Sequence, residues 1–122
     1  RVEGSGADWL DAVEPEFQAF HWHAETFSIP VGSEYLLRSE CYANQAFAWG
    51  DHLAMQFHLE MTEEMVEGWI DRYGSDLDLD SRCNQARQAV TADLGANVRR
   101  LNQVADQVYS VWLQRVRARR AN

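Results

Sequence analysis

Hydrophobic and polar residues alternate over the first half of the chain and follow a helical period over the second half. Residues 17–23 are rich in aromatic side chains and alternate, which favours a strand with His21 and His23 on one face. Three more short strands are predicted over residues 34–38, 45–49 and 53–58. Because Gly50-Asp51 is typical of a hairpin turn, we expect these strands to form a meander.

The helical period begins after Thr62, which is expected to cap a helix whose first turn is acidic and which ends at Gly74. A second helix is predicted over about residues 82–94, and a third over about residues 96–118, with Gly95 breaking the two apart. The second is expected to bury Cys83, Ala86 and Val90. The third carries one apolar stripe, which can face a core or a partner: Val98, Leu101, Ala105, Val108 and Trp112. Trp69 and Trp112 are expected to lie in a core or an interface.

The order of these elements predicts one partial domain over residues 1–122. Residues 1–16 form a polar arm with a short turn or a single helical turn at Trp9-Leu10, residues 17–60 the strands, and residues 62–118 a helical tail. Strands followed by helices indicate an α/β domain with helices packed on a sheet. Since layered α/β domains usually interleave these elements, the order is typical of the tail of a larger domain.

Composition and charge narrow the classes of function. The 122 residues are 46% hydrophobic, which is sufficient for one core, and they carry a net charge of −8. Residues 1–98 hold 5 Arg against 18 acidic residues, and residues 99–122 hold 6 Arg against one. The acidic body argues against nucleic acid as a partner, and no apolar run is long enough for a membrane span. Without a visible signal peptide we expect a cytoplasmic protein, with Cys41 and Cys83 as reduced thiols.

The pair His58 and Glu60 is the strongest candidate for chemistry. The two residues lie two positions apart at the end of a predicted strand, so their side chains should point the same way. A carboxylate beside an imidazole fixes its tautomer, as a general base beside a nucleophile requires. On spacing alone, a surface histidine beside a solvated glutamate is the simpler interpretation.

Three segments resemble the C-terminal half of class I glutamine amidotransferases, in particular the stand-alone type related to the amidotransferase domain of GMP synthase. They are residues 20–27, residues 44–47 and residues 55–62, the last of which reads Met-Gln-Phe-His-Leu-Glu-Met-Thr. The resemblance implies the C-terminal part of a flavodoxin-like three-layer α/β/α domain. It also implies hydrolysis of the amide of glutamine and transfer of ammonia, without a cofactor or a metal. His58 would be the general base and Glu60 its orienting carboxylate in a Cys-His-Glu triad.

Departures from the family pattern bear on activity. Leu59 stands where the family has Pro, which is expected to be harmless because its side chain should point away from the site. Ala24 stands where the family has Gly, which matters if the backbone there has positive φ. The nucleophile of the family lies in a Gly-x-Cys-x-Gly turn, and neither Cys41 nor Cys83 has a flanking glycine. The chain alone is therefore expected to be inactive, with Cys41 as a packing residue or, alternatively, a free reactive thiol.

Other functions remain open from the residues. His21 and His23 together with His58 or His52 are a possible metal site. Residues 76–81 look like the start of a calcium loop, but Arg87 stands where the loop needs Glu, so we interpret an acidic solvated loop. The rival to an enzyme is a non-catalytic fragment that acts as an interaction module. We expect it to form a homo-oligomer through an exposed sheet edge or through the helix at residues 96–118.

Overall fold

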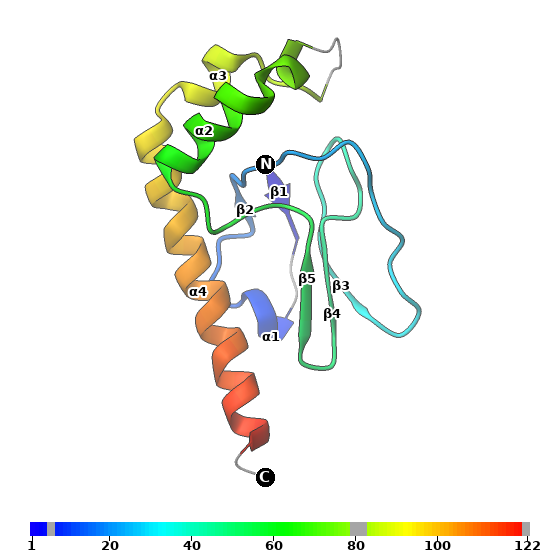
Figure 1. Ribbon diagram of the computed structural model, residues 1–122. Coiled ribbons are helices and arrows are strands. Elements are labelled where there is room, and N and C mark those ends of the chain that lie inside the picture. Colours follow the sequence, from blue (N-terminus) through cyan, green and yellow to red (C-terminus); the bar gives the residue numbers. More distant parts are fainter. Residues whose placement is uncertain (5–6, 79–82, 121–122) are drawn as a thin grey trace.

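The computed structural model describes residues 1–4, 7–78 and 83–120, and it has a mixed α/β architecture (Figure 1). Five short strands and four α-helices make up the described part of the chain. The strands are β1 (Val2–Glu3), β2 (Glu16–Phe17), β3 (Glu34–Leu37), β4 (Ala46–Trp49) and β5 (His52–Met55). The helices are α1 (Ala7–Leu10), α2 (Glu63–Tyr73), α3 (Arg87–Thr91) and α4 (Leu94–Arg120), with a 3₁₀ turn at Gly74–Asp78. The predicted helical turn at Trp9-Leu10 is confirmed as α1.

The predicted meander is confirmed. β3, β4 and β5 form one antiparallel sheet in that order, and β1 pairs with β2 in a separate two-stranded sheet. Gly50 makes the turn between β4 and β5 with φ 61°, a backbone conformation that glycine adopts without a steric penalty. β5, the last strand of this sheet, therefore leads directly into the segment that contains His58.

The predicted strand over residues 17–23 is wrong for most of its length. Only Glu16–Phe17 pairs, and Phe20 then makes one isolated bridge with His58. The aromatic side chains of this segment pack against a helix instead of extending a ladder. Phe20 and Trp22 each lie with their ring centroids 5.8 Å from the ring of Trp69 on α2. This packing makes α2 the cover over the His58 segment.

The first predicted helix is confirmed and the second is wrong. Thr62 Oγ1 accepts a hydrogen bond from the Met65 backbone N–H at 3.2 Å, which caps α2. The helix expected over about residues 82–94 is reduced to α3, in which no residue is buried. The break before α4 occurs at Asp93, whose φ is 53°, and not at Gly95, which lies inside α4 against the carboxylate of Glu63.

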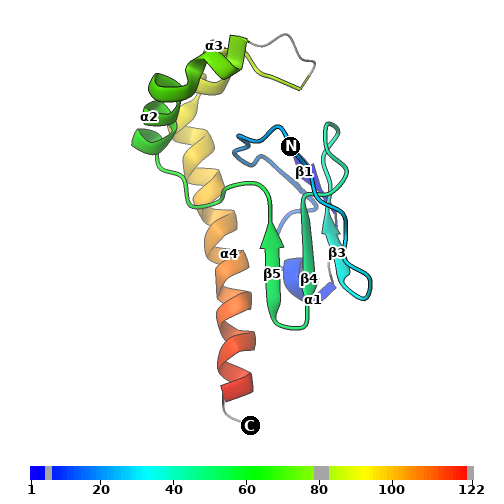
Figure 2. The same cartoon turned by 45° about the vertical axis from the view of Figure 1, so that its right-hand side comes forward.

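The long helix α4 closes the core. It runs the length of the molecule, with α2 and α3 gathered at one end and the sheet beside it (Figures 1 and 2). Four members of the predicted stripe are buried, three of them in the main core cluster, whereas Trp112 is 38% exposed. The Arg115 guanidinium lies 4.4 Å from the centre of the Trp9 ring and fastens α1 to α4. Most of the stripe therefore faces the core of the chain, whereas Tyr109, Trp112 and Leu113 of α4 keep partly exposed side chains. Association through this helix stays a prediction. No described helix combines the length and the apolar character that a membrane span needs.

The expectation of two reduced thiols is wrong. Cys41 and Cys83 form a disulfide with an S–S distance of 2.18 Å, across 42 residues of sequence. The fold brings the turn after β3 against the segment that leads into α3, so the two sulfur atoms meet. Cys83 lies in a turn before α3 and not in a helix. The acidic loop predicted over residues 76–81 lies partly outside the described residues, and its described part is the end of the 3₁₀ turn.

Candidate functional site

The candidate pair lies in the connection between β5 and α2. Along this connection the side chains of Phe57, Leu59 and Met61 are buried, and those of His58 and Glu60 point outward. Leu59 is 1% exposed, so its side chain points away from the pair, as the sequence predicts. The alternation of a strand therefore continues beyond the last sheet residue, Met55.

The structure brings His58 and Glu60 into direct contact. His58 Nδ1 lies 2.7 Å from Glu60 Oε1, and the other carboxylate oxygen accepts the Leu59 backbone N–H at 3.0 Å. The side chains are 31% and 50% exposed, so a reactant can reach them from solvent. A role for these two residues in catalysis stays a prediction. The geometry meets its first requirement, which is contact between the imidazole and the carboxylate.

The electrostatics of Glu60 favour the charged carboxylate. Partial burial raises the pKa of Glu60, but hydrogen bonds from backbone N–H groups and from His58 act in the opposite direction and outweigh it. The pKa of Glu60 is therefore lowered, and the group is ionised at neutral pH. An ionised carboxylate accepts a hydrogen bond from the protonated Nδ1 of a neutral imidazole. In this tautomer the free lone pair of His58 lies on Nε2. That nitrogen is the one from which a general base would act.

Aromatic rings hold the imidazole of His58 in place. Its ring centroid lies 5.2 Å from that of Trp69 in an edge-on arrangement and 6.2 Å from that of Phe20. The His58 backbone N–H donates to the Phe20 carbonyl at 2.9 Å. Trp69 packs against the core cluster, which confirms its prediction as a packing residue.

Two residues of α4 that the sequence analysis missed also reach the site. The Asn102 side-chain amide donates to the Met61 carbonyl at 3.1 Å and lies 3.5 Å from the Leu59 carbonyl. Burial and the negative charge of Glu60 together raise the pKa of Tyr109. For Asn102 the sequence did contain a signal, because this polar residue directly follows Leu101 of the apolar stripe. A residue at that position lies at the border of the buried face of the helix.

The histidines at 21 and 23 form a second pair on the neighbouring segment. His21 Nδ1 lies 3.3 Å from His23 Nε2, and His23 Nδ1 lies 2.9 Å from the carbonyl of Glu25, which only accepts. Burial, followed by the charges of His23, the Arg1 amino group and His58, lowers the pKa of His21 from 6.5 to about 4. Within the described ranges no group of three or more His, Cys, Asp or Glu residues is arranged to hold a metal ion, so the metal site finds no support.

Ala24, where the family pattern has glycine, is compatible with the observed backbone. Among the described residues other than glycine only Asp93 has positive φ, so the Cβ of Ala24 creates no backbone strain. The neighbouring loop is linked to the connection between β3 and β4 through the Ala24 carbonyl, which accepts a hydrogen bond from the Tyr42 hydroxyl at 3.3 Å. The Gln56 side-chain amide donates to the Glu25 carbonyl at 2.7 Å and adds a second tie.

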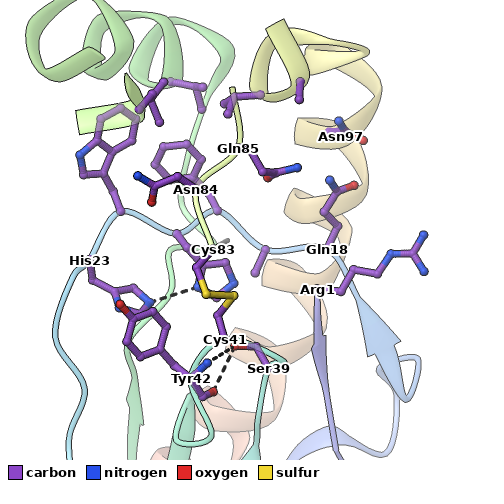
Figure 3. Close-up of a pocket in the computed structure, with 18 of the residues that line it drawn as sticks. Arg1, Gln18, His23, Ser39, Cys41, Tyr42, Cys83, Asn84, Gln85 and Asn97 are labelled. Atoms are coloured by element: carbon purple, nitrogen blue, oxygen red, sulfur yellow. Dashed lines mark hydrogen bonds between the residues drawn. A yellow bond between two sulfur atoms is a disulfide. The ribbon is translucent and has the colours of Figure 1, made fainter. Parts of the chain in front are cut away.

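A cavity of about 740 Å³ lies beside the second histidine pair (Figure 3). His23, Cys41 and Tyr42 line one side, and Asn84 and Gln85 line another, with the disulfide between them. Neither His58 nor Glu60 is among the described residues that line it. Both cysteines are in the disulfide, so neither presents the thiolate that a cysteine nucleophile requires. The alternative of Cys41 as a free reactive thiol is therefore wrong for this structure.

The fold and the His–carboxylate pair define the class first: a small mixed α/β domain with a partly exposed imidazole in contact with a carboxylate. No protein-family model matches the chain, and no curated protein matches it. Solved structures do match. The glutamine amidotransferase from Methylobacillus flagellatus is similar with a TM-score of 0.86 and 32% identity, over 93% of this chain and 50% of that one.

Two further structures share the fold. A glutamine amidotransferase from Thermotoga maritima has a TM-score of 0.65 and 23% identity, over 93% of this chain and 47% of that one. The protein SMU.1228c has a TM-score of 0.74 and 23% identity, over 92% of this chain and 50% of that one. The chain thus spans about half the length of the solved structures that it matches. The resemblance to glutamine amidotransferases is confirmed as a structural match over about half of each solved chain, which is consistent with a partial domain of that fold.

Proposed function

We propose that this chain contributes the general base and its carboxylate to the hydrolysis of glutamine, with transfer of the ammonia to an acceptor. The observation that carries the proposal is the 2.7 Å contact between His58 Nδ1 and Glu60 Oε1, on a fold shared with a glutamine amidotransferase at 32% identity. The nucleophilic thiolate would come from a segment outside these 122 residues, because both cysteines here are bonded to each other.

The chemistry follows from the orientation of the imidazole. His58 Nε2 would take the proton of an incoming thiol, and the thiolate would attack the amide carbon of glutamine. The resulting imidazolium is stabilised by the ionised Glu60 and gives its proton to the departing ammonia. A water molecule, deprotonated by His58, would then cleave the thioester to release glutamate. The sum is glutamine and water converted to glutamate and ammonia.

We further propose that the chain is the C-terminal part of a flavodoxin-like three-layer domain. Two features support this placement: the meander β3-β4-β5 leads directly into the His-x-Glu segment, and α4 contacts the backbone of that segment through Asn102. The match over about half of each solved structure is compatible with it. Under this proposal the remaining half would supply the nucleophile and the backbone N–H groups that stabilise an oxyanion.

A chimera tests the catalytic proposal. The half of the Methylobacillus flagellatus protein that this chain matches is replaced by residues 1–122, and glutamate release from glutamine is measured. We expect turnover that falls by roughly 10²–10⁴-fold in His58→Ala. The matched control is His52→Ala, which removes an exposed histidine of β5 and should leave turnover unchanged.

Two outcomes would contradict the proposal. One is a folded chimera whose turnover is the same with and without His58. The other is glutamine turnover by the isolated chain that is lost in Cys41→Ser, because the nucleophile would then lie within these residues.

A second candidate is a non-catalytic module that self-associates. The observation in its favour is a set of exposed aromatic side chains on the meander, Tyr35 at 42% and Trp49 at 55% exposure. A dimer or larger oligomer is expected from light scattering at micromolar concentration, with a lower mass for Trp49→Arg. A monomeric mass would contradict this candidate.

A further inference from the structure

The backbone of residues 59–61 is held by a residue far away in the sequence. Asn102 lies in α4, and its side-chain amide donates to the Met61 carbonyl at 3.1 Å and lies at 3.5 Å from the Leu59 carbonyl. These contacts cross 41 and 43 residues of sequence. Because an amide group carries two N–H donors, one asparagine can serve both carbonyls.

These two carbonyls need a donor from outside their own segment. β5 ends at Met55 and α2 begins at Glu63, so residues 59–61 belong to no strand or helix. The side chains of Leu59 and Met61 are 1% and 0% exposed, which draws their backbone into the protein. A buried carbonyl without a partner is unfavourable, and Asn102 supplies the missing hydrogen bonds.

The position of Glu60 depends on this support. Glu60 lies between the two supported residues, and one of its carboxylate oxygens accepts the Leu59 N–H at 3.0 Å. The other oxygen reaches His58 Nδ1 at 2.7 Å although half of the Glu60 side chain is exposed. An exposed, flexible glutamate keeps such a contact only when its backbone is fixed, because solvent and rotamer entropy compete with it.

We propose that Asn102 is a positioning residue that fixes the 59–61 backbone and thereby holds the proton of His58 at Nδ1. It acts through Glu60 and touches no reacting atom. The inference deepens the proposed function, since a base at Nε2 requires this tautomer. It does not depend on turnover, because the tautomer is a property of the isolated chain.

The test measures the tautomer of His58 by long-range proton–nitrogen NMR at a pH where imidazole is neutral. The wild-type chain is expected to show the Nδ1–H form. Asn102→Ala removes both donors, and Asn102→Asp places a carboxylate against two carbonyl oxygens. Both variants are expected to lose the Nδ1–H form in favour of the Nε2–H form that an unrestrained imidazole prefers.

The matched control is Asn97→Asp on the same helix. Asn97 donates to the Ala92 carbonyl at 3.2 Å, so the same chemical change removes a hydrogen bond elsewhere on α4. The control should keep the Nδ1–H form. An unchanged tautomer in the Asn102 variants, or an equal change in the control, would overturn the proposal.

A measurement on the wild-type chain decides the case if the Asn102 variants do not fold. Side-chain amide protons bonded to buried carbonyls exchange slowly with solvent, so those of Asn102 should be protected. Gln103, exposed on the next position of α4, is the reference. Exchange at Asn102 as fast as at Gln103 would overturn the proposal. If the tautomer responds as expected while the chimera shows no turnover, the positioning role stands and the glutaminase proposal fails.

Discussion

Two pairs of side chains in this molecule have the same spacing and opposite electrostatics. His58 and Glu60 form one pair, His21 and His23 form the other, and in each the partners are two positions apart and within hydrogen-bonding distance. The first joins an imidazole to an ionised carboxylate at an exposed edge. The second joins two partly buried imidazoles, of which His21 has a pKa lowered to about 4.

The difference shows that the sequence spacing brings two side chains together, whereas their surroundings determine whether they can take up a proton. A carboxylate partner can stabilise a proton taken up by His58, so that ring is suited to accept one. The burial of His21 and the positive charges around it oppose protonation, so that ring stays neutral through the physiological range. The predictions below break or sharpen this contrast, in order of decreasing effect.

Removal of the disulfide is expected to change the free energy of unfolding most, and the bond lies near the His21–His23 pair. Cys41 and Cys83 line the same cavity as His23 (Figure 3) and close a loop across 42 residues. The double variant Cys41→Ser, Cys83→Ser is expected to lower the free energy of unfolding by about 4 kcal/mol, since the unfolded chain regains the entropy of that loop. Urea denaturation measures the loss.

The control for the disulfide is the wild-type chain reduced with a dithiol, which should match the double variant in stability. The tautomer of His58 should not respond, because the His58–Glu60 contact lies outside the cavity lining. Equal stability of the oxidised chain and the double variant would contradict the assigned bond.

The local features of the fold could be read from the sequence. Alternation, the turn at Gly50 and the cap at Thr62 predicted the meander and the first helix, because each depends on residues within a few positions. The contact of His58 with Glu60 was within reach for the same reason. The period of the apolar residues placed α4, including the burial of Leu101 and Val108.

The features that were missed depend on contacts between distant parts of the chain. The Cys41–Cys83 bond joins residues 42 positions apart, and no local pattern pairs them. Asn102 reaches Met61 across 41 residues, so its role was visible only once α4 had been placed against the site.

Leu59→Ala is expected to have the next largest effect on stability, and this residue lies between His58 and Glu60. Leu59 is 1% exposed in the core, and its truncation should cost about 3 kcal/mol of unfolding free energy through lost burial and a residual cavity. It also loosens the backbone that carries Glu60. The matched control is Leu113→Ala, a 41% exposed leucine of α4, which should change stability by less than about 1 kcal/mol. Equal losses in both variants would contradict the anchoring role of Leu59.

The His21–His23 pair is expected to make stability depend on pH. The pKa of His21 is lowered from 6.5 to about 4 in the folded chain, so the unfolded chain binds the proton more readily. Stability is therefore full above pH 6.5 and falls as the pH decreases toward 4. The loss should be about 2 kcal/mol after allowance for the exposed part of the ring. His21→Gln should remove this slope in urea denaturation, whereas His52→Gln, at an exposed histidine, should keep it.

Glu60→Gln is expected to change stability least. It gives the most direct test of the contrast between the His58–Glu60 pair and the His21–His23 pair. The pKa of Glu60 is lowered, so the stability that it contributes is present above pH 4.5 and is lost as the pH falls through the folded pKa. Because the side chain is half exposed, the change at neutral pH should be below about 1 kcal/mol, measured by urea denaturation. The acidic window of Glu60 thus lies below most of the window of His21, and the two slopes can be separated. A wild-type chain whose stability shows no additional loss below pH 4.5 relative to Glu60→Gln would mean that the carboxylate gains nothing from His58 and the backbone. The exposed pair would then be a chance neighbourhood of two side chains and not a prepared base.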